Sequence, residues 1–197
     1  MTRKRWIADR VEGDRAWLLG SNANHLFRVL RVKVGQGFDV AAEGRLRMAK
    51  VIAASHDQVE FWLGAEVAST ALPQITVYLS IFKFDRLEWA LEKLTELGVS
   101  HVVPMIAQRT EEHLAKAASK RVERWRKIAR EASQQARRIA PPEIAEAAAL
   151  KKAITEAELE LFNASGWKAA SLGHTILRAE TAAIAAVAVA MAELEPR

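Results

Sequence analysis

The chain has 197 residues, of which 50% are hydrophobic and 27% charged, a composition that suits a globular protein of one ordinary domain or two small ones. It contains no cysteine, which excludes disulfides, thiolate metal sites and cysteine nucleophiles, and predicts a protein of the reducing cytoplasm. The net charge of +5 makes a polyanion a reasonable partner, although many basic enzymes share this balance.

Residues 6–67 are predicted to form a small β-rich barrel. Alternating apolar runs separated by glycines are typical of strands joined by tight turns, and they lie at 16–19, 38–42, 46–53 and 59–63. One short helix, capped by Ser21 or Asn22, interrupts them. Arg28 and Arg31 are three residues apart, which places both on one face of this helix, where they suit the phosphates of a nucleic acid.

Beyond residue 70 the pattern changes to alternating strands and helices. A strand at 75–81, a helix at 85–97 ended by Gly98 and a strand at 101–106 predict a parallel sheet with helices on its faces. Further helices are expected at 119–138, before two prolines, and from a capping box at Thr155 to Gly166. The sequence therefore predicts two domains, residues 1–70 and 71–197.

The segment 116–138 carries nine basic and two acidic residues. A solvated helix face explains this as well as a phosphate-binding surface does, and both interpretations stay open. Trp125 lies on the apolar face of this helix and is expected in the core. Three further tryptophans lie within apolar patterns and are also expected in the core: Trp17, Trp62 and Trp89.

Residues 169–184 form the most informative stretch of the sequence. An apolar run at 169–172, expected as a strand, breaks at Gly173, and an alanine-rich helix then begins with Arg178, Glu180 and Thr181. Such a turn presents backbone N–H groups and polar side chains at one point, where α/β folds bind ligands. We therefore predict a ligand site here.

The apolar run 182–192 is shorter than the ~20 residues that cross a bilayer, so it is predicted to be a buried helix or an interface. Because it is apolar on nearly every side, we expect a homodimer that covers it. Residues 8–15 are charged where a signal peptide needs an apolar core, so neither export nor a membrane is expected. The histidines are scattered without carboxylates at ligand spacing, and no metal site is predicted.

Four motifs resemble, in the same order, those of the ribosomal RNA small subunit methyltransferase E family, whose members methylate N3 of a uridine in 16S rRNA. They are His25-Leu-x-Arg-Val-Leu-Arg31, then Leu91-x-Lys-x-Thr-Glu-Leu-Gly-Val99 with Arg109 beyond it, then Arg124-Trp125-x-Lys-Ile128 with Gln135 and Arg138, and finally Leu172-Gly-x-x-Ile-Leu-Arg-x-Glu-Thr-Ala182. The resemblance covers nearly the whole chain.

The resemblance implies a mixed α/β protein with a PUA-like RNA-binding β-barrel at 1–70 and a SPOUT methyltransferase domain with a trefoil knot at 71–197. It implies S-adenosylmethionine as the cofactor, a homodimer, and 16S rRNA or the small ribosomal subunit as the partner. The implied catalytic residues are Arg178 and Glu180. The implied cofactor contacts are Leu172, Gly173, Ile176, Leu177 and Thr181, and the implied RNA contacts are Arg28, Arg31, Arg109, Arg124, Gln135 and Arg138.

The chemistry of uridine suggests roles for the two catalytic candidates. N3 of uracil is a weakly acidic imide, so its methylation requires removal of a proton and stabilisation of the resulting anion. Arg178 is always cationic and can pair with a uracil oxygen. Glu180 can either accept the proton or orient Arg178, and both roles stay open.

The chain departs from the family just before Thr155. Family members carry a further strand and a Gly-Pro-Glu-Gly-Gly loop there, whereas here Ile154 runs directly into Thr155. A true deletion would remove a strand and half of the cofactor site and leave a gap beside the sheet. We therefore expect that the strand and loop are present in the protein as a mobile segment that was left out of the sequence numbering, and not truly deleted.

Two alternatives to a methyltransferase remain open. If the loop is truly absent, the protein would be an RNA-binding or ribosome-assembly protein without catalysis. A different nucleotide-binding enzyme is the other alternative, but no glycine-rich phosphate-binding loop supports it.

Overall fold

The computed structural model describes residues 5–69, 72–149, 160 and 162–194. The chain divides into two compact units, each described by itself below. The first unit comprises Met1–Ala71 together with Ser133–Pro141, and the second comprises Leu72–Ala132 together with Pro142–Arg197. The second unit is thus interrupted in sequence by a short segment that belongs to the first, which the sequence pattern does not reveal.

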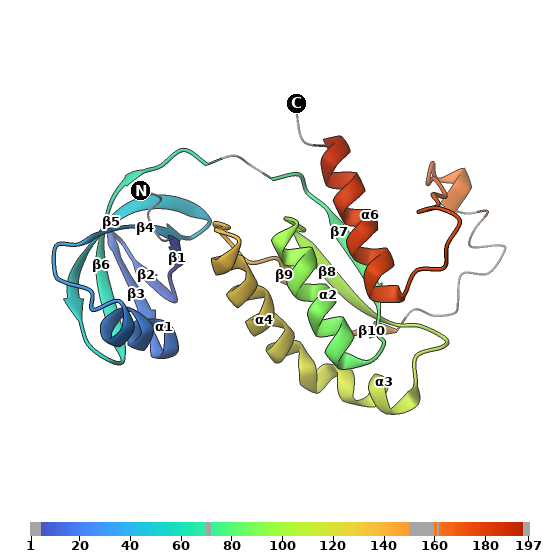
Figure 1. The fold of residues 1–197 in the computed structure, drawn as a ribbon, viewed down its shortest axis with the longest axis horizontal. Coiled ribbons are helices and arrows are strands. Elements are labelled where there is room, and N and C mark those ends of the chain that lie inside the picture. The colour runs from blue at the N-terminus through green and yellow to red at the C-terminus, as the bar shows by residue number, and fades with distance from the viewer. Residues whose placement is uncertain (1–4, 70–71, 150–159, 161, 195–197) are drawn as a thin grey trace. The chain divides into compact units, whose positions relative to one another are not determined.

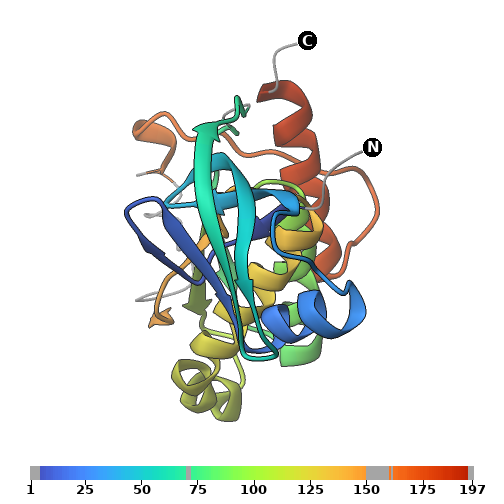
Figure 2. The ribbon, with the colours of Figure 1, turned by 90° about the vertical axis from the view of Figure 1, so that its left-hand side faces the viewer.

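Six strands of the first unit form one curled sheet, which can be followed in Figure 2. Their order in the sheet is β1-β4-β5-β6-β3-β2, and all neighbours are antiparallel except β1 and β4. The strands are β1 (Arg5–Ile7), β2 (Arg10–Glu12), β3 (Arg15–Leu19), β4 (Gly37–Ala42), β5 (Arg45–Ala54) and β6 (Gln58–Glu66). All four strands predicted for this region are confirmed.

The core of the first unit lies inside the curl, because alternate side chains of each strand point to the same face. Phe38 and Phe61 meet there edge to face, with ring centroids 5.9 Å apart. On β6 the next residue, Trp62, points outward and is 50% exposed, so its predicted core position is wrong, whereas Trp17 is buried as predicted.

The short helix of the first unit differs from its prediction. It begins as α1 (Gly20–Asn24), preceded by Leu19 without a side-chain cap, and widens into the π-helix η1 (His25–Val29), where the Leu30 N–H donates to the His25 carbonyl at 3.1 Å. Helical geometry ends before Arg31, which has a φ of 47°. The next residue, Val32, is buried. Because Leu19 occupies the N-cap position, the predicted cap is wrong. Because Arg31 lies outside the helix, the shared helical face of Arg28 and Arg31 is also wrong.

The segment Ser133–Pro141 packs on the first unit near β1. Ile139 packs against a small buried cluster of Ile7, Ala41 and Leu46. In addition, Nη1 of Arg5 donates a hydrogen bond to the carbonyl of Arg137.

The second unit contains a parallel sheet, as predicted. Its strands are β7 (Thr76–Ser80), β8 (His101–Ile106), β9 (Glu143–Ile144) and β10 (Ala148–Ala149). β7 pairs with one side of β8, and the short β9 and β10 pair in turn with the other side. All these pairings are parallel, which confirms the βαβ unit.

Helices cover this sheet and connect its strands (Figure 1). They are α2 (Phe84–Glu96), α3 (Glu112–Ala118), the 3₁₀ turn η2 (Ser119–Arg121), α4 (Val122–Gln135) and α6 (Ala179–Leu194). The helix predicted at 119–138 is therefore shorter at both ends, and Arg137 lies beyond it with a φ of 56°. Residues 160 and 162–164 are helical before Gly166, whereas the predicted capping box at Thr155 lies outside the described residues.

α2 and α6 lie side by side and run in the same direction (Figure 1). Near their N-termini, Arg86 of α2 pairs with Glu180 of α6. Near their C-termini, Gly98 faces Met191, and a Cβ at Gly98 would lie 2.6 Å from its methyl carbon. The buried core beneath includes Trp125, as predicted, whereas Trp89 on α2 is 47% exposed, so its predicted core position is wrong.

Candidate functional site

The carboxyl ends of β7 and β8 form one edge of the parallel sheet, which is where α/β folds bind ligands. Thr110 ties the two strand ends together. Its Oγ1 donates to the Ile81 carbonyl at 3.1 Å and accepts from the Ala107 N–H at 3.0 Å. Arg109 lies exposed in the turn that Thr110 closes, so the structure places this predicted RNA contact at the carboxyl edge.

The first turn of α6 lies at the same edge, because it is paired with the first turn of α2, the helix that follows β7. Nη1 of Arg86 is 3.5 Å from Oε1 of Glu180, whose side chain is only 8% exposed. Arg178 precedes α6, and its carbonyl accepts the Ala182 N–H at 2.8 Å. The side chains of Arg178 and Thr181 are exposed. The structure thus brings an exposed cation and a buried carboxylate to the edge of the sheet.

The strand predicted at 169–172 is wrong, because these residues form no strand. The run is Ala-Ala-Ser-Leu, whose small side chains bury little apolar area and have low strand propensity. Gly173 has a φ of 118°, which favours glycine, and Ser171 Oγ donates to its carbonyl at 3.1 Å. Leu172 and Ile176 expose their apolar side chains, so the residues predicted to contact the cofactor present an open apolar surface beside a glycine turn.

The sequence runs without interruption through Ile154 and Thr155, and its numbering is continuous over all 197 residues. The continuous numbering does not test the expectation of a segment omitted from it, which stays a prediction. The structure around this point lies outside the described residues.

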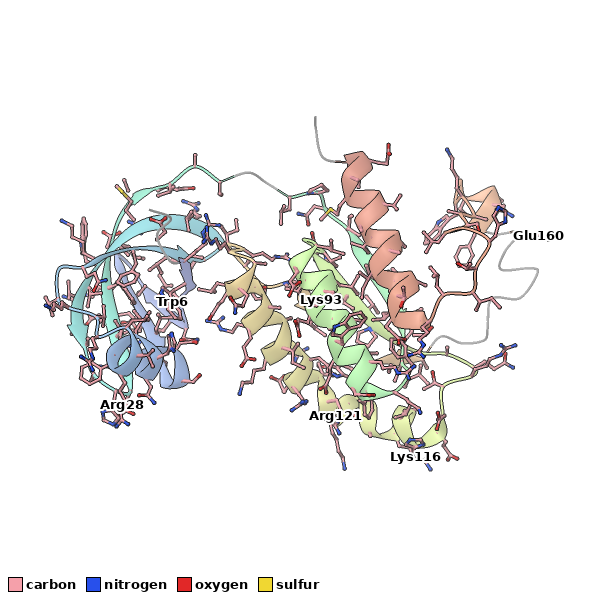
Figure 3. All side chains as sticks on the ribbon, viewed as in Figure 1. Trp6, Arg28, Lys93, Lys116, Arg121 and Glu160 are labelled. Atoms are coloured by element: carbon pink, nitrogen blue, oxygen red, sulfur yellow. The ribbon has the colours of Figure 1, made fainter. Side chains whose placement is uncertain are left out.

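The predicted RNA contacts of the basic helix do not lie in one place. Arg124 donates from Nε and Nη2 to the two carboxylate oxygens of Glu88, both at 2.8 Å, and these hydrogen bonds raise the pKa of Arg124. Gln135 is the exposed last residue of α4 and belongs, like Arg138, to the first unit. Burial lowers the pKa of Arg138. Figure 3 shows other cations on separate elements, such as Lys93 on α2 and Lys116 on α3.

The π-helix and the segment that follows it carry exposed cations of the first unit. Arg28, Arg31 and Lys33 are all exposed, and no ion pair involves any of them among the residues that the structure describes. Figure 3 labels Arg28 at the short helical segment of the first unit. Phe27 beside it is 41% exposed. Our sequence reasoning missed Phe27 and Lys33, which neighbour the two predicted arginines.

Sequence reasoning also missed Arg86. The signal was available, because Arg86 stands in the first turn of α2, where the helix dipole disfavours a cation. A nearby carboxylate offsets this effect, but the sequence does not show that the carboxylate is that of Glu180.

Within the described ranges, no three His, Asp or Glu side chains come together in a way that could hold a metal ion. Nor does any helix in those ranges combine the length and apolarity that crossing a membrane requires.

Comparisons with known proteins identify the family. The model of the RNA methyltransferase domain matches residues 70–157 and 152–191, and that of the RNA methyltransferase PUA domain matches residues 18–61. The first model matches in two stretches that meet where the sequence lacks the family's loop.

Two curated relatives bear the name ribosomal RNA small subunit methyltransferase E. That of Aquifex aeolicus is 31% identical over 134 residues, which are 67% of this chain and 58% of the relative. That of Bacillus subtilis is 31% identical over 131 residues, 64% of this chain and 51% of the relative. The chain thus spans about half the length of the curated relatives it matches.

A solved structure shares the fold. It is a ribosomal RNA small subunit methyltransferase E from Neisseria gonorrhoeae bound to S-adenosyl methionine, with a TM-score of 0.78, 23% identity and 98% of each chain covered. The family model matches more than half of the chain, and the chain belongs to the RNA methyltransferase family.

Proposed function

We propose that this protein transfers a methyl group from S-adenosylmethionine to N3 of a uridine in 16S rRNA. The observation that carries the proposal is the family match over residues 152–191, which includes the motif at 172–182 with Arg178. The names of the curated relatives support rRNA as the substrate, and the cofactor named with the gonococcal structure supports S-adenosylmethionine.

Arg178 and Glu180 are the catalytic residues of the proposal. The exposed guanidinium of Arg178 would pair with a uracil oxygen and stabilise the imide anion. Glu180 is buried and ion-paired, so it is better suited to orienting Arg178 than to accepting a proton from the uridine.

The cofactor would lie against the open turn at 172–177. Leu172 and Ile176 offer exposed apolar side chains that suit the adenine ring, Gly173 and Leu177 offer backbone groups, and Thr181 follows in the first turn of α6. When bound, S-adenosylmethionine supplies the methyl group.

The first unit would bind the RNA. The match to a PUA domain supports this role for residues 1–70, and the exposed cations around Arg28 and Arg31 supply contacts for phosphates. Phe27, exposed among them, is able to stack on an unpaired base. Further proposed contacts lie elsewhere in the chain: Arg109, Arg124, Gln135 and Arg138. Of these, Arg124 is the weakest candidate, because Glu88 already binds its guanidinium.

Residues 71–197 would form a SPOUT methyltransferase domain with a trefoil knot, and the protein would act as a homodimer in the cytoplasm. The homodimer is supported by α6, which buries Val187 and Met191 but leaves Val189 58% and Leu194 56% exposed. A second copy would cover these apolar side chains.

A second function has an observation of its own. The loop that family members carry before Thr155 is absent from the continuous sequence, and residues 169–172 form no strand. Both features weaken the cofactor site and leave the first unit unaffected. An RNA-binding or ribosome-assembly protein without catalysis is therefore the alternative.

Two measurements on the full chain separate these functions. Calorimetry with S-adenosylhomocysteine measures cofactor binding, and incubation of 16S rRNA or small subunits with labelled S-adenosylmethionine, followed by nucleoside mass spectrometry, detects N3-methyluridine. The proposal expects both binding and N3-methyluridine. Binding of rRNA without either signal would support the alternative, and methylation of another atom would refute the proposed specificity.

A further inference from the structure

Arg86 lies in the first turn of α2 and pairs with Glu180 in the first turn of α6. Nη1 of Arg86 is 3.5 Å from Oε1 of Glu180, and the two side chains are 42% and 8% exposed. The helix dipole favours a carboxylate in a first turn and disfavours a cation there. The position of Arg86 is therefore unfavourable for α2 alone, and the carboxylate of the neighbouring helix compensates for it.

Glu180 depends on this partner. A carboxylate removed from water is costly unless it is paired. Among the residues that the structure describes, Arg86 provides the ion pair of Glu180. Without the guanidinium, the carboxylate would regain its hydration only if the first turn of α6 moved away from α2.

The same turn fixes the backbone of Arg178. The Ala182 N–H donates to the Arg178 carbonyl at 2.8 Å, which is the first hydrogen bond of α6. Any movement of this turn therefore moves Arg178 as well. A misplacement of about 1 Å in a reacting group is enough to lower a rate by about 100-fold.

We propose that Arg86 is a positioning residue for methyl transfer, which anchors the first turn of α6 through Glu180 and so holds Arg178 at the carboxyl edge of the sheet. Glu180 transmits this anchoring and does not itself accept the proton. The inference rests on the proposed function for its kinetic consequence, whereas the anchoring is a property of the fold.

The test compares Arg86→Gln, Arg86→Lys, Glu180→Gln and the double variant Arg86→Gln/Glu180→Gln in the full chain. Arg121→Gln is the control for loss of an ion pair, because Arg121 is also 42% exposed and also lies 3.5 Å from its carboxylate partner, Glu88, which is still paired with Arg124. This variant also removes the cation–π contact of Arg121 with Phe84. Hydrogen–deuterium exchange of a peptide that covers 179–185 reports the anchoring, and steady-state methylation with a cofactor titration reports kcat and KM.

Arg86→Gln should lower kcat by about 10- to 100-fold and leave the KM for the cofactor within about twofold. Exchange in the first turn of α6 should rise by about tenfold or more, since local opening becomes easier. Arg86→Lys retains the charge and should recover most of the rate. The double variant removes the buried charge together with its partner, so it should restore slow exchange and much of kcat. Arg121→Gln should change neither quantity.

Unchanged exchange in Arg86→Gln would overturn the anchoring. Restored exchange with a persistently low kcat in the double variant would overturn the positioning role, because Glu180 would then act in the reaction itself. If the unchanged protein transfers no methyl group, the proposed function fails, and the exchange comparison still decides whether Arg86 anchors α6.

Discussion

Gly98 follows the C-terminus of α2 and lies against Met191 of α6. Its φ is 96°, a conformation that L side chains rarely adopt, and a Cβ there would lie 2.6 Å from Cε of Met191 and 3.3 Å from Cδ1 of Leu72. Gly98→Ala should therefore be destabilising for two separable reasons. The backbone conformation should cost about 1–2 kcal/mol. The close approach should add about 1 kcal/mol, the low end for overpacking, because the methionine methyl can move.

A double-mutant cycle with Met191→Ala separates the two costs. Met191→Ala alone should cost about 2–5 kcal/mol, since the side chain is buried. In that background Gly98→Ala should lose the overpacking part and keep the backbone part of about 1–2 kcal/mol. Gly13→Ala is the control for the backbone part in the first unit, because Gly13 has a φ of 58° and a Cβ there would meet nothing within 4 Å.

Urea denaturation followed by hydrogen exchange measures these free energies. Peptides from α2 and α6 report the second unit, and a peptide from β3 reports the Gly13→Ala control in the first unit. A Gly98→Ala variant as stable as the original chain would refute the reasoning. A cost that vanishes completely in the Met191→Ala background would show that the contact, and not the backbone conformation, is responsible.

Three further predictions concern function. Affinity for rRNA should fall as salt rises, and replacing Arg28 and Arg31 together by Ala should weaken binding and flatten that salt dependence, as measured by titration at several salt concentrations; an unchanged slope would remove this segment from the interface. Arg178→Ala should lower turnover at saturating cofactor by about 100-fold, with a much smaller change in the dissociation constant of S-adenosylhomocysteine measured by calorimetry; loss of cofactor binding with normal transfer would reassign the residue. Light scattering at micromolar concentration should show a homodimer, which Val189→Asp on α6 should dissociate, and a monomeric original chain would contradict it.

Regular elements with a clear apolar period were predictable from the sequence. The strand at 101–106 and the helix ended by Gly98 were found with nearly their observed bounds, because local pattern and burial agree there. The run at 169–172 was not, because its apolar letters are mostly alanines that bury little area.

The candidate site was predictable in place but not in its contacts. The motif around Arg178 pointed to the start of the last helix, where the structure puts it. The pairing of Glu180 with Arg86 could not be found this way, because it joins residues far apart in the sequence through the packing of two helices. Likewise, the helix ends before Arg31, and the next residue, Val32, is buried. The periodic pattern of apolar residues in the sequence does not predict this end.

The return of Ser133–Pro141 to the first unit has a consequence for synthesis on the ribosome. Domains usually fold in the order in which they are made. Val67 and Ile139 both pack against the cluster of Ile7, Ala41 and Leu46, and Ile139 is made only after the first half of the second unit. A nascent chain therefore carries the complete six-stranded sheet without Ile139 on this cluster while the whole span from Leu72 to Ala132 is translated. Translation speed through that span would then set how long the apolar cluster stays without Ile139.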